Sequence, residues 1–85
     1  MDAARLAWQC RRGMLELDLL LQAFLDRDYA HATPEIQQDF VALLHHADDM
    51  LYAYLMGHMV PFEPRTAAIV ARIRRTVAAG ETTPV

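Results

Sequence analysis

The side chains of this chain that could take part in catalysis are one cysteine, four histidines and a few carboxylates. Cys10 would need a base within hydrogen-bond reach to act as a nucleophile, but its own helix contains no histidine, since the histidines stand at positions 31, 45, 46 and 58. Glu16 and Asp18 lie two residues apart, so a helix would turn them toward different faces and they would not form an acid–base pair. The sequence therefore predicts no catalytic residue, and we expect that the protein is not an enzyme.

The same residue types do not form a metal-binding pattern. His45 and His46 would diverge by about 100° on a helix, and we expect a helix break between His45 and Asp49. A structural zinc site requires four nitrogen or sulfur ligands at a characteristic spacing, and the chain contains no such spacing. We therefore predict no metal site.

The stretch CRRGMLELD, residues 10–18, has a structural interpretation that requires no partner. Gly13 would end the first helix in the left-handed conformation and serve as the N-cap of the second. Glu16 would then reach back to the Gly13 backbone N–H, as in half of a capping box. Arg11 and Arg12, near the end of the first helix, would complement the helix dipole.

The same stretch also has the composition of a binding surface. Two guanidinium groups and a carboxylate surround a residue without a side chain; arginine forks bind carboxylates, and glycine lets another backbone approach closely. An aromatic residue one turn earlier is of the type enriched in interface hot spots. On the residues alone the two interpretations are equally supported, and both can hold. The predicted partner-binding surface consists of Arg12, Gly13, Glu16, Arg11 and Trp8.

Charge and composition argue against two classes of partner. The 85-residue chain has a net charge of -3, so no overall field attracts nucleic acid. The arginines of the RIRR segment, Arg72, Arg74 and Arg75, are not interleaved with aromatic residues for base stacking. No apolar run approaches the ~20 residues that span a bilayer. We expect no nucleic acid and no membrane among the partners.

The N-terminus and the cysteine content indicate a compartment. MDAARLAW lacks the apolar core of a signal peptide. A single cysteine cannot form an internal disulfide, which fits a reducing environment. We expect a cytoplasmic protein.

Glycines and prolines divide the chain into segments that predict an all-α fold, a compact bundle of about five short helices. β-branched residues are sparse, and no segment alternates apolar and polar residues over a useful length. One domain would cover residues 1–79, with a flexible C-terminal tail over 80–85. We expect helices over residues 3–11, 14–26, a third that begins at 34, 49–56, and a fifth that runs from 64 until Gly80 ends it.

Residue types also predict helix ends and buried faces. Thr33 is expected as an N-cap before Pro34, at the first helical position. Asp48 is expected to cap the fourth helix, and Gly57 to close it. The buried faces are predicted to consist of Leu17, Leu20, Leu21, Phe24 and Leu25; Ile36, Phe40, Leu43 and Leu44; and Ile69, Val70, Ile73 and Val77.

The segments ARLAWQCRRGMLELDLLLQAFL and FVALLHHADDMLYAYLMGH resemble the SdhE-type succinate dehydrogenase assembly factors. The hallmark Arg-Gly-x-x-Glu of that family matches Arg12, Gly13 and Glu16. The resemblance extends over roughly residues 4 to 78. The four-residue spacing is weakly specific alone, but it is strong within CRRGMLELD near the start of a short helical chain.

Two positions depart from the pattern of that family. Met50 stands where a second acidic residue is usual, so no role is carried onto it. Tyr54 stands where a tryptophan is usual, and it preserves an aromatic residue that we expect in the core.

The resemblance implies a five-helix bundle, monomeric when free, that binds the flavoprotein subunit of succinate dehydrogenase or of fumarate reductase. It implies a chaperone that promotes covalent attachment of FAD to that subunit by holding a reactive arrangement of it. FAD would reside in the partner flavoprotein, with no cofactor bound stably by this chain. Carried over residue by residue, Arg12, Gly13 and Glu16 form the centre of the docking surface, with Arg11 and Trp8 beside them.

Two alternatives stay open at this point. Relatives have also been labelled CptB-type antitoxins, so the main alternative is an antitoxin-like regulatory protein that binds a partner protein. That role usually requires an inhibitory segment, and only the tail ETTPV is available for it. A small FAD-binding carrier is less well supported, because no glycine-rich phosphate loop follows a strand.

Overall fold

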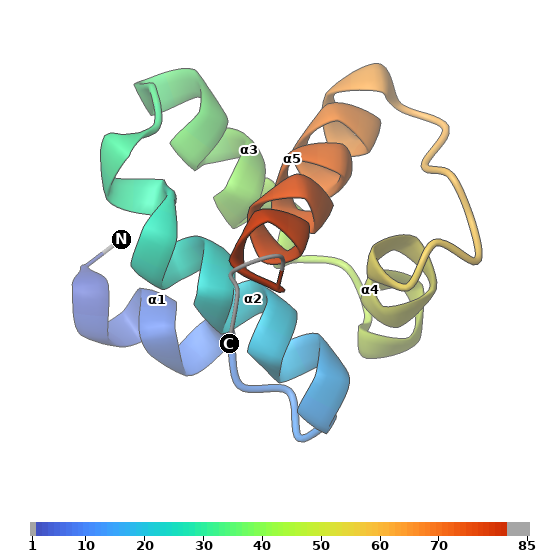
Figure 1. The fold of residues 1–85 in the computed structure, drawn as a ribbon, viewed down its shortest axis with the longest axis horizontal. Coiled ribbons are helices and arrows are strands. Elements are labelled where there is room, and N and C mark those ends of the chain that lie inside the picture. The colour runs from blue at the N-terminus through green and yellow to red at the C-terminus, as the bar shows by residue number, and fades with distance from the viewer. Residues whose placement is uncertain (1, 82–85) are drawn as a thin grey trace.

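Residues 2–81 are described by the computed structural model, and they form five α-helices and one short 3-10 helix, with no β-strand among them (Figure 1). The predicted all-α bundle is therefore confirmed. The 3-10 helix lies between the second and third predicted helices. The elements are α1 (Ala3–Gln9), α2 (Leu15–Arg27), η1 (Tyr29–His31), α3 (Pro34–Leu43), α4 (Asp48–Leu55) and α5 (Pro64–Glu81).

Helix α5 is the element around which the others are arranged. It packs against α2, α3 and α4, and Figure 1 shows α3 on one side of it and α4 on the other. Helix α1 lies beside α2, on the side of the molecule opposite α4 (Figure 1). Within residues 2–81, no helix is long and apolar enough to cross a membrane.

The core forms where the predicted apolar faces meet. Phe24 of α2 and Phe40 of α3 are fully buried, and their ring centroids lie 4.7 Å apart, within the range in which aromatic rings attract each other beyond area burial. Most of the predicted face is buried, while Leu20, Leu25, Ile36 and Val77 are half-buried at its edge. The core also contains Leu6, Cys10, Leu51, Tyr54 and Leu55.

Two predicted helix ends are confirmed. The Thr33 side chain caps α3 by accepting a hydrogen bond from the Ile36 N–H at 3.3 Å. Gly57 follows α4 with φ of 78°, and the His58 N–H closes the helix by donating to the Ala53 carbonyl at 2.8 Å. That bond is the one expected of a left-handed C-terminal glycine.

Two other predicted ends are wrong. Asp48 is the first residue of α4 rather than its cap, because Ala47 occupies the N-cap position and the Asp48 carboxylate pairs with Arg12. Helix α5 continues through Gly80 to Glu81, since a glycine is tolerated inside a helix at a cost of about 1 kcal/mol. Residues 82–85 of the predicted tail lie outside the described residues.

A single carboxylate fastens the end of α2 to α5. Asp28 accepts hydrogen bonds from Arg72 Nε at 2.6 Å, from Arg72 Nη2 at 3.0 Å and from Thr76 Oγ1 at 3.4 Å. The bond from Arg72 holds the pKa of Asp28 below its ordinary value. Arg72, one of the arginines of the RIRR segment, therefore has a structural role.

Candidate functional site

The predicted site residues lie in the connection between α1 and α2, residues 10–14, and in the adjoining ends of the two helices, where Trp8 belongs to α1 and Glu16 to α2. Helix α1 ends at Gln9 with Cys10 as its C-cap, two residues before its predicted end at Arg11. The Arg11 N–H still donates to the Trp8 carbonyl at 3.0 Å. The chain then leaves the helix, because the next two N–H groups bind a carboxylate of α2 instead of the preceding turn.

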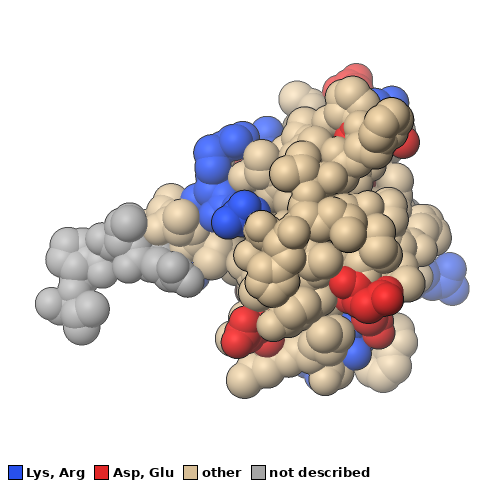
Figure 2. All heavy atoms as spheres, turned by 90° about the vertical axis from the view of Figure 1, so that its right-hand side faces the viewer, with Lys and Arg blue, Asp and Glu red and all other residues tan. Residues whose placement is uncertain are grey.

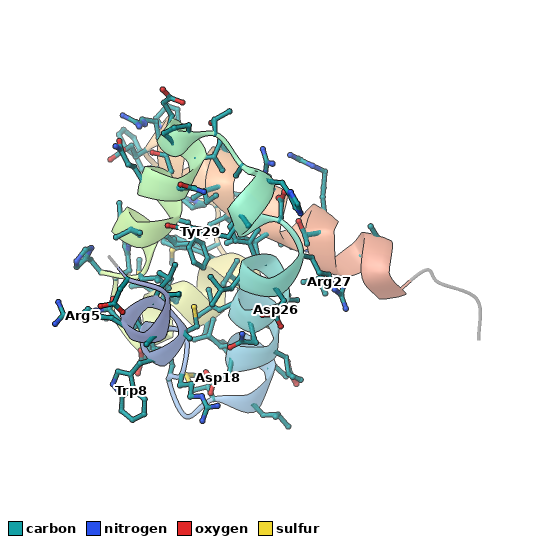
Figure 3. All side chains as sticks on the ribbon, turned by 90° about the vertical axis from the view of Figure 1, so that its left-hand side faces the viewer. Arg5, Trp8, Asp18, Asp26, Arg27 and Tyr29 are labelled. Carbon is teal, nitrogen blue, oxygen red and sulfur yellow. The ribbon has the colours of Figure 1, made fainter. Side chains whose placement is uncertain are left out.

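That carboxylate belongs to Asp18, which Figure 3 shows directed from α2 toward α1. Its Oδ1 accepts from the Arg12 N–H at 2.8 Å, and its Oδ2 accepts from the Gly13 N–H at 3.1 Å. The capping role predicted for Glu16 is therefore wrong, and so is that of Gly13, since Met14 is the N-cap of α2. Two residues on a helix differ by about 200° in direction, so when Asp18 faces the connection Glu16 faces away from it.

Gly13 adopts the predicted left-handed conformation, with φ of 78°. A Cβ at this position would meet nothing within 4 Å. Glycine is required here by the backbone conformation rather than by crowding within the chain. The exposed Cα therefore leaves room for another backbone to approach.

The Arg12 guanidinium is engaged within the chain. Nε donates to the Gln9 carbonyl at 2.8 Å and Nη1 to Asp48 Oδ1 at 3.0 Å. Nη2 donates to the Leu44 carbonyl, and Nη1 has a longer contact of 3.5 Å to the His46 carbonyl. Carbonyl groups at helix C-termini carry partial negative charge, so one cation holds the ends of α1 and α3 and the start of α4 together. Its side chain is 16% exposed.

The other predicted site residues face solvent. Trp8 is 73% exposed and projects away from α1 (Figure 3), and Arg11, Gly13 and Glu16 are exposed as well. Trp8 and Arg11 line a shallow hollow of about 540 Å³ together with Arg12 and the turn between α3 and α4. Glu16 lines a different hollow beside α5. The structure therefore places Trp8, Arg11 and Arg12 at one hollow and Glu16 at another.

Residue types alone did not identify four side chains in or near the α1–α2 connection. Asp18 and Asp48 hold it in place, and their pairing required contacts between segments distant in sequence. Leu15 and Leu19 are 76% and 61% exposed. A signal for these two leucines exists in the sequence, because they are four residues apart and lie off the apolar stripe of α2.

The structure also shows the surroundings of the cysteine and histidines that were considered as candidates for catalysis and metal binding. Burial raises the pKa of the Cys10 thiol to about 11, although the charge of Arg12 opposes the shift, so the thiol is protonated and unreactive near neutral pH. The expected helix break between His45 and Asp49 is present, since α4 begins at Asp48. Among residues 2–81, no three histidine, cysteine, aspartate or glutamate side chains are grouped so that they could hold a metal ion.

A family model and several known proteins match this chain. Residues 4–77 match the family model Sdh5, described as flavinator of succinate dehydrogenase. The chain is 45% identical over 74 residues to the FAD assembly factor SdhE of Shewanella oneidensis, covering 87% of this chain and 90% of that protein. It is 49% identical over 73 residues to the FAD assembly factor SdhE of Legionella pneumophila strain Paris, covering 86% and 91%. The protein of that name from Coxiella burnetii is 37% identical over 71 residues, covering 84% and 87%.

Proposed function

This chain belongs to the Sdh5 family of flavinators of succinate dehydrogenase, and we propose that it binds the flavoprotein subunit of succinate dehydrogenase, or of fumarate reductase, and promotes covalent attachment of FAD to it. The observation that carries this proposal is the family match, which runs over residues 4–77 and includes the whole α1–α2 connection. The chain acts as a binding protein, and the residues that react with the flavin are those of the partner.

The geometry of the α1–α2 connection supports a docking role. Asp18 and Arg12 fix the backbone of Gly13 from the inside, while Trp8 and Glu16 are exposed on the outside. A surface that is already ordered loses little conformational entropy when it binds. The residues of the Arg-Gly-x-x-Glu segment therefore have two roles in this proposal. Arg12 holds the surface in place, and Gly13 and Glu16 contact the partner.

The proposal places FAD in the partner and not in a site of this chain. Dinucleotide sites are commonly built from a glycine-rich turn between a strand and a helix. Residues 2–81 contain no strand, and the two glycines with positive φ, Gly13 and Gly57, are isolated. This arrangement supports placing FAD in the partner.

The decisive experiment measures covalent flavin in the flavoprotein subunit by fluorescence on a denaturing gel. Cells would express the wild-type chain, Glu16→Ala, Glu35→Ala or no chain. Glu16 and Glu35 are matched, because each is exposed and is the second residue of its helix. We expect at least about tenfold less flavin with Glu16→Ala, equivalent to about 1.4 kcal/mol of lost interaction, and no loss with Glu35→Ala. Equal flavin in all four strains would contradict the proposal.

Gly13 offers a second test with a built-in control. Gly13→Arg places a long side chain where a partner backbone would approach, but it also strains a left-handed position by about 1–2 kcal/mol. Gly13→Asn adopts that conformation more readily and adds a smaller side chain. If docking requires space at this Cα, flavin attachment decreases from wild type to Asn to Arg, while thermal melts show both variants folded. If flavin attachment follows only the melting temperature, Gly13 is structural.

A further inference from the structure

A hollow of about 650 Å³ lies between α2, α5 and the end of α4, and we call it the α2–α5 groove. Its floor is apolar and includes Leu19, Leu20 and Ala23 of α2 and Val77 of α5. Leu19 is 61% exposed, so part of this apolar surface is not used by the core. Glu16, one of the residues of the proposed docking surface, stands in the lining of the same groove.

Two arginines in the groove lining have no ion-pair partner among the described residues. Arg12, Arg65 and Arg72 each pair with an aspartate, whereas Arg27 and Arg74 do not, and both line the groove. Figure 2 shows one cluster of basic side chains on this face of the molecule, while other basic and acidic side chains are spread over the rest of it. An unpaired guanidinium beside an apolar floor suits an acidic and apolar ligand.

Gly57 helps to set the position of Arg74. A Cβ at position 57 would lie 2.8 Å from Arg74 Nη2, so the guanidinium rests against the bare Cα of this glycine. There it complements the C-terminal end of α4, where the carbonyl groups carry partial negative charge. This contact leaves the N–H donors of the Arg74 guanidinium unused, since the structure records no hydrogen bond from the Arg74 side chain to the described residues. The donors remain available to a ligand.

The walls of the groove determine the conformation of its occupant. Each wall is a helix, whose backbone groups are already paired within the helix. An extended segment could not form backbone hydrogen bonds with such walls, whereas a helix satisfies its own. From Glu16 to Arg27 the groove follows α2 over 12 residues, whose 11 rises span about 16 Å, the length of three helical turns.

We propose that the α2–α5 groove seats an amphipathic helix of the flavoprotein subunit, with an acidic C-terminal end against Arg27 and Arg74. This inference rests on the proposed function, because the groove shares Glu16 with the docking surface and the same partner would cover both. The helix runs parallel to α2. Its positive N-terminal end faces the Glu16 carboxylate, and its negative C-terminal end faces the arginines.

Two charge reversals test the inference on the full chain. Arg74→Glu and Arg75→Glu make the same change of net charge at neighbouring positions of α5, but Arg75 lines a different hollow. The affinity for the purified flavoprotein subunit would be measured by titration calorimetry. We expect Arg74→Glu to raise the Kd at least about tenfold and Arg75→Glu to raise it less than threefold. Equal effects, or no effect of Arg74→Glu, would overturn the inference.

The outcomes separate this inference from the proposed function. If the wild-type chain does not bind the subunit, the proposed function fails. If the wild-type chain binds, Gly13→Arg weakens binding and neither Glu16→Ala nor Arg74→Glu does, the function stands and the groove has no role. Arg74→Gln, which keeps a neutral polar side chain, is measured beside Arg74→Glu, and circular dichroism melts of both variants show whether they are folded.

The occupant is identified by cross-linking. A photoreactive amino acid in place of Leu19 is irradiated in the complex and the product is mapped by mass spectrometry. We expect the cross-link in a helical segment of the flavoprotein subunit that ends in an acidic residue. Capture of a second copy of this chain, or of its own residues 82–85, would overturn the inference.

Discussion

The α1–α2 connection and the α4–α5 connection (residues 56–63) both expose large apolar side chains, yet they are held differently. Trp8 and Leu15 flank the first at 73% and 76% exposure, while Val60 and Phe62 stand in the second at 82% and 101%. Polar bonds fix the first to α1, α2, α3 and α4. Among the described residues, no hydrogen bond to protein holds residues 60–62, and Figure 1 shows this segment as an open curve beside α4.

Under the proposed function, exposure of apolar side chains does not by itself mark a docking surface, because both connections have it. A binding surface gains affinity when its geometry is fixed before the partner arrives. Of these two connections, the α1–α2 connection is framed by side-chain bonds from Asp18, Arg12 and Asp48, whereas among the described residues the hydrogen bonds of residues 57–59 of the other are backbone bonds to α4. The frame and the exposed residues can be altered separately.

The largest effect on stability is expected from Arg12→Ala. It removes the cation that bridges three helix ends, and we expect the free energy of unfolding to decrease by about 2–4 kcal/mol. Arg11→Ala, one residue away and exposed, should change it by less than about 0.5 kcal/mol. Urea unfolding followed by circular dichroism measures both. If the two variants lose stability equally, Arg12 is not the frame.

A smaller loss is expected from Asp18→Asn. The amide retains one acceptor oxygen, but its NH₂ group faces an N–H donor, so the loss is about 1–2 kcal/mol. Hydrogen exchange of the Arg12 and Gly13 amides should accelerate. Asp26→Asn is the control on the same helix, because Asp26 accepts only a surface bond from Gln22. An unchanged exchange rate in Asp18→Asn would show that the carboxylate is not the anchor.

The buried thiol of Cys10, in the α1–α2 connection, makes the free energy of unfolding depend on pH. Its pKa is raised by burial from the ordinary 9.0 to about 11, so between these values the folded chain retains a thiol proton that the unfolded chain has lost. The stability that the buried thiol contributes is therefore fully present below pH 9 and is lost as the pH rises toward about 11. Unfolding measured at pH 8, 9.5 and 11 should show a steeper decline in wild type than in Cys10→Ala. Parallel declines would mean that the thiol is not buried in solution.

The smallest effect is expected in the other connection. Phe62→Ser should change the free energy of unfolding by less than about 0.5 kcal/mol, because the ring is 101% exposed. Flavin attachment should also equal that of the wild type. Thermal melts and gel fluorescence measure the two quantities. A loss of flavin without a loss of stability would show that exposure alone does identify a docking side chain here, and the comparison would break.

The local features of this chain were determined by its sequence. The helical apolar faces, the Thr33 cap and the left-handed conformation of Gly13 and Gly57 were predictable, since each depends on residues within one or two turns of each other. The exposure of Trp8, Arg11, Gly13 and Glu16 also agrees with a predicted surface. These features follow from helix periodicity and backbone sterics, which act over short distances along the chain.

Only the tertiary structure decided which polar side chains build the frame. The Leu44 carbonyl and the Asp48 carboxylate, which accept hydrogen bonds from Arg12, lie 32 and 36 residues from it in the sequence. Arg74 of α5 lies against Gly57, which follows α4. The choice of Asp18 over Glu16 as the anchor depended on which face of α2 turns toward α1. A charged side chain has many acceptors within reach along the sequence, and only the packed positions of the helices select among them.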